Sequence, residues 1–208
     1  MTALTNGNYV VGSSFWDNGG ISDAGAATWV NGATGATMNG LNTISSANSL
    51  VGTGTSNDVA VDGIVALSNG NYVVVSPGWD GAGDDRGAVT WGNGATGTAG
   101  NVTTANSLFG GTDDDRVGSG GVYALTNGHY VVASPFSDQG AGTFHGAVTW
   151  GSGTGATGAQ VTAANSFVGG AANASVGAGG IVVLTNGNYV IRTPNFDAGA
   201  GSNHVAVT

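Results

Sequence analysis

The chain of 208 residues lacks three residue types altogether: it has no Cys, no Glu and no Lys. Without Cys it can form no disulfide bond, no thiolate metal site and no thiol nucleophile. Glu and Lys are strong helix formers, whereas Gly and Asp favour turns. Their absence beside 41 Gly residues therefore argues against helices. Disorder is equally disfavoured, because 40% of the residues are hydrophobic and fall in periodic runs.

Positive charge is also scarce. All three fixed cations are Arg and all twelve carboxylates are Asp, which gives a net charge of −9. Binding to nucleic acid or to an anionic membrane surface requires clustered Lys and Arg, so both functions are disfavoured. We identify neither a signal peptide nor an apolar run long enough for a transmembrane helix. Met1 falls within a strand pattern and Thr208 stands where other repeats place Trp, so we expect a piece of a longer array.

One nine-residue segment occurs four times and organises the rest of the chain. The copies are Ala3–Val11, Ala66–Val74, Ala124–Val132 and Val183–Ile191. In each copy two apolar runs flank an Asn-Gly pair. This pattern predicts a β-hairpin with a type I′ turn, in which both central residues have positive φ. The copies recur about every 60 residues, which indicates a tandem repeat with several strands per unit.

The third repeat shows the expected strands most clearly. We predict strands at residues 120–125, 130–134, 146–150 and 160–168, with Pro135 ending the second because it has no amide hydrogen for the ladder. Four antiparallel strands per unit are typical of a propeller blade. In each of the first three repeats a Trp ends the third strand and is expected to pack between neighbouring blades; these are Trp29, Trp91 and Trp150.

The predicted fold class is therefore all-β, as a β-propeller of four blade-like, four-stranded repeats. Two alternatives remain open: half of an eight-bladed ring formed by two chains, and an open β-repeat array. The chain is expected to form one repeat domain, residues 1–208. Its units are approximately residues 1–52, 53–110, 111–169 and 170–208, and the last lacks its final strand.

The loop between the second and third strands carries the candidate ligand-binding residues. Each copy has one Asp at the same place with an aromatic residue beside or near it. An aromatic ring can cover the C–H face of a sugar while a carboxylate accepts hydrogen bonds from its hydroxyls. The alternative is that Asp accepts backbone amides in a Gly-rich turn and the ring covers the blade. The residues are Trp16, Asp17, Trp79, Asp80, Phe136, Asp138, Phe196 and Asp197.

Metal binding and catalysis receive less support. Asp80, Asp84 and Asp85 form an acidic run that could offer oxygen ligands to calcium, and Asp113–Asp115 form a second cluster that Arg116 follows. We assign no metal or other cofactor to either cluster. Nothing in the spacing of the three histidines selects a catalytic site, so we expect the protein not to be an enzyme. These histidines are His129, His145 and His204.

The repeat resembles the FG-GAP repeat of integrin α-chain propellers. Phe109-Gly110 opens the third unit, Ala133-Ser134-Pro135 takes the place of Gly-Ala-Pro, and Gly146-Ala147-Val148 follows. This resemblance implies a propeller. It does not extend to the calcium loop of that family, because Thr126-Asn127-Gly128 occupies its place. The chain also resembles, over nearly its whole length, an uncharacterised tandem repeat of about 59 residues in large bacterial surface and adhesin proteins.

These resemblances imply a non-enzymatic structural or adhesive module located outside the cell or on a bacterial cell surface. The alternatives are a carbohydrate-binding propeller and an engineered propeller fragment. Residues 204–208 would form an outer strand without Lys or Pro, and such an edge is free to pair with another strand. We therefore expect a homo-oligomer, most simply a dimer through the terminal strands. A glycan is the other expected partner; nucleic acid and membrane insertion are not.

Overall fold

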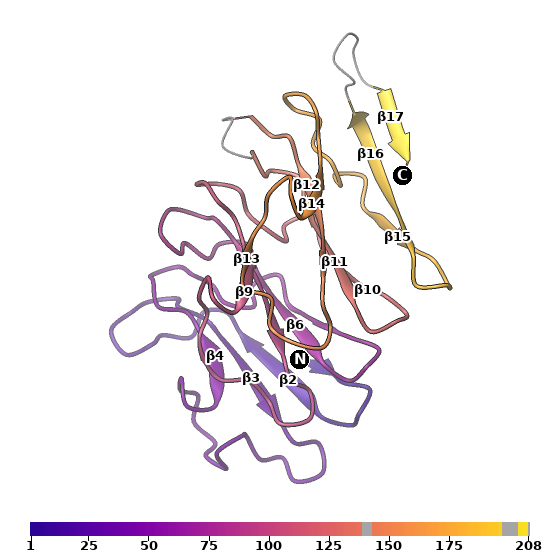
Figure 1. Ribbon diagram of the computed structural model, residues 1–208. Coiled ribbons are helices and arrows are strands. Elements are labelled where there is room, and N and C mark those ends of the chain that lie inside the picture. The colour runs from indigo at the N-terminus through magenta and orange to yellow at the C-terminus, as the bar shows by residue number, and fades with distance from the viewer. Residues whose placement is uncertain (139–142, 197–203, 208) are drawn as a thin grey trace.

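The computed structural model describes residues 1–138, 143–196 and 204–207, and for residues 195–196 and 204–207 we describe the backbone only. Every regular element in these ranges is a β-strand. The same ranges contain no helix that is long and apolar enough to cross a membrane. Blade-like sheets follow one another in chain order, from the indigo first repeat to the yellow fourth (Figure 1). The predicted all-β class with four repeats is confirmed, and the arrangement is propeller-like.

The repeats contribute their strands in the same order, named here A to D. Strand A is β1 (Thr2–Ala3), β5 (Ile64–Ala66), β10 (Val122–Ala124) and β15 (Ile181–Val183). Strand B is β2 (Tyr9–Ser13), β6 (Tyr72–Ser76), β11 (Tyr130–Ser134) and β16 (Tyr189–Phe196). Strand C is β3 (Ala26–Val30), β7 (Ala88–Gly92), β12 (Ala147–Gly151) and β17 (His204–Val207). Strand D is β4 (Ser49–Val51), β9 (Ser107–Phe109) and β14 (Ser166–Val168).

Strands A to D pair as an antiparallel meander, as the sequence predicts. In the third repeat the order is β10-β11-β12-β14, with Val132 opposite both Val122 and Thr149. Strand B ends at Ser134, directly before Pro135, which confirms the predicted stop. The sheets remain separate and are not closed into a barrel.

The predicted strand at residues 160–168 is wrong, because it is two elements. β13 (Ala159–Gln160) pairs in parallel with β9 of the preceding repeat, whereas β14 pairs with β12 of its own repeat. Asn165 makes the break between them. Its side chain accepts the amide of Thr162 at 2.9 Å and donates to the carbonyl of Gln160 at 2.8 Å. β8 (Gly100–Asn101) pairs with β4 in the same way, so part of the C–D connection joins the preceding sheet in the second and third repeats.

The hairpin turn also differs from its prediction. Gly128 has φ +88, as expected, but Asn127 does not have positive φ, so the turn is not type I′. The amide of Gly128 donates to Leu125 at 3.2 Å, and that of Leu125 to His129 at 2.8 Å. These bonds define a three-residue loop, a type I turn followed by a left-handed glycine. The Asn127 side chain stabilises it by accepting the amide of His129 at 3.2 Å.

The hydrophobic core lies between repeats. One buried cluster combines Leu4, Val10 and Trp29 of the first repeat with Tyr72 and Val74 of the second. Two further clusters join the second repeat to the third and the third to the fourth. Burial raises the pKa of Tyr72 to about 12, as it does that of Tyr130. The expected packing of Trp between blades is confirmed for Trp29, which is 5% exposed, whereas Trp150 is 47% exposed.

At each of the first two interfaces a single carbonyl accepts three side-chain hydrogen bonds. The carbonyl of Gly94 accepts Asn6 Nδ2 at 2.8 Å, Asn8 Nδ2 at 2.9 Å and Trp29 Nε1 at 2.9 Å, all from the preceding repeat. At the next interface the carbonyl of Gly153 accepts the equivalent Asn69, Asn71 and Trp91 at 2.8, 2.9 and 3.0 Å. The hairpin Asn therefore serves both its own turn and the neighbouring repeat.

Candidate functional site

The B–C loop of the second repeat places both of its predicted site residues against other parts of the protein. Trp79 is only 4% exposed and belongs to the core shared with the first repeat. Asp80 Oδ2 accepts Asn57 Nδ2 at 2.8 Å, and its Oδ1 accepts the amide of Asp85 at 3.2 Å. Burial raises the pKa of the Asp80 carboxyl, although these two hydrogen bonds act to lower it. Asp80 thus attaches the B–C loop to the D–A loop, which lies between β4 and β5.

In the third repeat the aromatic residue is shifted by one position. Ser137, fully buried, stands where the second repeat has Trp79, and Phe136 is 42% exposed. Phe136 contacts Phe144 edge-on, with ring centroids 5.5 Å apart. Asp138 Oδ1 accepts Thr112 Oγ1 at 2.6 Å, and the Asp138 amide donates to Asp115 at 2.8 Å. Thr112 and Asp115 belong to the D–A loop, so the same connection between loops recurs with different residues.

The first repeat leaves the predicted pair more accessible. Asp17 is exposed and accepts the amide of Asp23 at 3.0 Å, while Trp16 is half-buried. Phe15, beside it, is 73% exposed. A cavity of about 460 Å³ is lined by Gly12, Ser13, Ser14, Phe15, Trp16 and Ile44. In the fourth repeat Asp197 and the side chain of Phe196 lie outside the described residues. Each pair thus stays in its own loop, and no hydrogen bond described here joins two of them.

Two Arg side chains pair with three of the six carboxylates in the two acidic clusters. Arg116 binds Asp85 at 2.8 Å and Asp114 at 2.9 Å, and Arg86 lies 3.5 Å from Asp113. Asp115, buried, accepts the amides of Gly111 and Thr112 at 2.7 and 3.0 Å. Among the described residues no group of three or more His or Asp is arranged to hold a metal ion.

Asp58 is the carboxylate with the least favourable surroundings. Burial raises the pKa of its carboxyl, and repulsion from Asp23 and Asp85 raises it further. Its Oδ1 is buried without a hydrogen-bond partner, and its backbone has φ +46. The amide of Asp58 donates to the carbonyl of Asp23 at 3.0 Å, so this residue is held where the first two repeats meet.

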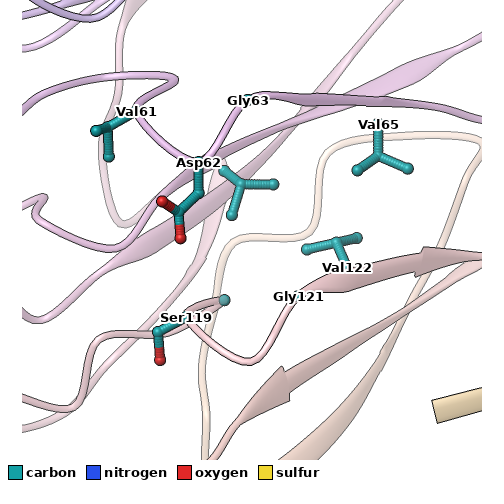
Figure 2. A pocket seen from close by; sticks show the side chains of 9 residues that line it. Val61, Asp62, Gly63, Val65, Ser119, Gly121 and Val122 are labelled. Carbon is teal, nitrogen blue, oxygen red and sulfur yellow. The ribbon is translucent and has the colours of Figure 1, made fainter. Parts of the chain in front are cut away.

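A further cavity, of about 530 Å³, lies between strand A of the second repeat and strand A of the third. Figure 2 shows Asp62 and Ser119 on one side of it, and Val65 and Val122 facing each other across it. Ser119 Oγ is buried and has no hydrogen-bond partner among the described residues. This polar pair could bind one small hydroxylated molecule. At the following interface Gly120 replaces Asp62, and Tyr123 replaces Val65 and donates its hydroxyl to Gly120 at 3.2 Å.

Sequence reasoning did not select Asp62 or Ser119, and the only signal was a comparison of repeats. Asp stands once at a place where the next two repeats have Gly120 and Gly179. Val65 is a second difference between these repeats, because it is smaller than the equivalent Tyr123. The Asp does not recur at this place in the following repeats, although Val65 has an equivalent in Val182.

These observations define an all-β tandem-repeat protein whose recurring polar and aromatic residues lie largely between repeats. The chain belongs to the family described as a repeat of unknown function, DUF5650. The family model matches it four times, at residues 3–61, 66–119, 124–178 and 183–208. A comparison with curated proteins found no match.

Proposed function

We propose that the chain is a non-enzymatic structural module, which builds an extended scaffold in a bacterial surface or adhesin protein outside the cell. The observation that carries this proposal is that the recurring side chains form hydrogen bonds within the protein. The hydrogen bonds of Asn6, Asn8 and Trp29 run to the neighbouring repeat, and that of Asp80 ties the B–C loop to the D–A loop. Recurring residues that hold adjacent repeats together fit a protein whose role is structural. The surface location is supported by the resemblance to adhesin repeats and by the absence of Lys and Cys.

A carbohydrate-binding role is the second candidate, and the first repeat is what favours it. There Phe15 is exposed and borders a cavity together with Trp16, and Asp17 offers an exposed carboxylate. This arrangement meets the requirement for an aromatic face beside a hydrogen-bond acceptor. The equivalent Trp79 is buried, so the candidate applies to one loop and not to the whole array.

A glycan array combined with thermal unfolding separates the two roles. For a scaffold we expect no binding to the array, and Trp79→Ala should lower the melting temperature while Phe15→Ala leaves it nearly unchanged. Phe15 is the matched control because its ring is exposed. Glycan binding that is lost in both Phe15→Ala and Trp16→Ala, without loss of stability, would replace the scaffold proposal by the carbohydrate one.

A further inference from the structure

The faces through which adjacent repeats contact one another have two sides, which we name by their hydrogen bonds. The donor face of a repeat presents the leucine that directly follows strand A and the hairpin Asn. The acceptor face presents the hairpin glycine carbonyl, the glycine carbonyl after strand C and two apolar residues of strand B. At the first interface Leu4 and Asn6 form the donor face, against Gly70, Gly94 and Val74.

The donor face of the fourth repeat is open in the described structure. The leucine that follows its strand A, Leu184, is 37% exposed, whereas Leu4, Leu67 and Leu125 are 5%, 0% and 2% exposed. Val190 is half-buried, and the equivalent Val10, Val73 and Val131 are fully buried. Asn186 still accepts the amide of Asn188 at 3.0 Å, so the hairpin keeps the conformation of the other three.

The acceptor face of the first repeat is open as well. Tyr9 and Val11 are half-buried, whereas their equivalents Tyr72, Val74, Tyr130 and Val132 are fully buried. A cavity of about 170 Å³ adjoins Val11 and is lined mainly by apolar surface. Gly7 and Gly32, equivalent to Gly70 and Gly94, are exposed, and no Asn side chain in the described part of the chain reaches their carbonyls.

From these two faces we propose that the chain associates head to tail with a second copy of itself. Leu184 and Val190 of one copy pack on Tyr9 and Val11 of the other, and Asn186 donates to the carbonyls of Gly7 and Gly32. The argument is continuity with an established interface: the hairpin Asn donates to the hairpin glycine carbonyl of the next repeat at all three interfaces, and to the glycine carbonyl after strand C at the first two. It extends the proposed scaffold role and does not depend on it.

Head-to-tail contact has a definite geometric consequence. The two faces lie on the first and fourth repeats, at opposite ends of the array (Figure 1). Such an interface is heterologous: every docked copy leaves one donor face and one acceptor face free, so association continues until a ring closes or a filament grows. Pairing of two β17 edges, by contrast, would stop at a symmetric dimer.

Two single-face variants test the proposal. Leu184→Asp disables the donor face, and Val11→Asp disables the acceptor face; both side chains are partly exposed, so the fold should survive. Each variant should raise the dissociation constant for self-association about 100-fold, since burying an aspartate in place of an aliphatic side chain removes the burial energy and adds a desolvation cost. Val61→Asp, 41% exposed and outside both faces, is the matched control.

Mixing the two variants gives the decisive measurement. Each has one intact face, and the two intact faces are complementary, so the mixture should form a complex of twice the 20.0 kDa chain mass in sedimentation velocity. The unaltered chain and Val61→Asp should form larger species as concentration rises. A monomeric unaltered chain at the solubility limit overturns the proposal. So does a dimer that persists unchanged in both single variants, which is the result expected for edge pairing. Circular dichroism of each variant confirms that loss of association is not loss of fold.

Discussion

Replacing Gly153 by Ala should be one of the most damaging small substitutions in the chain. A Cβ at this position would overlap the carbonyl oxygen of Gly128, which is backbone and cannot rotate away. The strand end must therefore move. The carbonyl of Gly153 would move with it, away from Asn69, Asn71 and Trp91 of the second repeat.

The magnitude follows from two contributions. Overpacking costs about 1–3 kcal/mol, and partial weakening of the three hydrogen bonds adds on the order of 1 kcal/mol in total. We expect the free energy of unfolding to fall by about 2–4 kcal/mol, which for a chain of this size lowers the melting temperature by roughly 5–15 °C. Urea unfolding followed by circular dichroism, with thermal melts beside it, measures both quantities.

Gly155→Ala is the matched control, two residues away. No atom lies within 4 Å of the position its Cβ would take, and its φ is not in the left-handed region. Because Ala restricts the unfolded chain more than Gly does, this variant should be neutral or slightly stabilising. Equal melting temperatures for the two variants would refute the close approach of the third-repeat turn and strand, and with it the role of the Gly153 carbonyl.

Three other predictions concern the polar contacts. Asn57→Ala removes the donor to Asp80 and the acceptor of the Thr53 and Gly54 amides, and should cost about 1–3 kcal/mol in urea unfolding, whereas the exposed Asn101→Ala should cost almost nothing. Asp58→Asn should raise the melting temperature at pH 7: the folded-state pKa of Asp58 lies above 3.8, so its carboxylate destabilises the fold as pH rises through that range. This gain should shrink in high salt and vanish at pH 3, and a gain independent of both would contradict the repulsion from Asp23 and Asp85. Adding a chelator should change the melting temperature by less than about 2 °C, because Arg116 already binds Asp85 and Asp114. A fall in the melting temperature of about ten degrees would reveal a bound cation.

Local chemistry made the strand order predictable. Pro135 directly follows the last residue of strand B and has no amide hydrogen for the ladder, and Gly128 adopts positive φ because it lacks a side chain. The turn type was wrong because Asn-Gly suits two hairpin loops, and the choice between them depends on hydrogen bonds of Leu125 that the sequence does not display. The break in residues 160–168 was missed for a related reason: one half of that segment pairs with the preceding repeat.

The candidate site shows where repeat comparison is insufficient. Asp80 and Asp138 occupy the same place, and the sequence predicted both. Their partners differ, however, since one carboxylate binds Asn57 and the other binds Thr112. Gly153 does have equivalents in Gly32 and Gly94, but the sequence does not show why glycine is needed there, which is the close approach of the hairpin glycine carbonyl. Contacts across an interface are fixed by docking geometry, which no single repeat encodes.

The position of the core has a consequence for how such a chain changes over time. Because each buried cluster is shared by two repeats, one repeat cut out alone would expose half of two cores and leave the Gly94-type carbonyl without donors. The segment that a gene duplicates, about 60 residues, is therefore not the segment that folds. Folding therefore requires neighbouring repeats, and inserting or deleting one whole repeat keeps the donor-to-acceptor kind of the remaining junctions. The number of repeats can then change while the chain stays folded. A substitution at a junction residue, by contrast, requires a compensating substitution in the residue of the neighbouring repeat that contacts it.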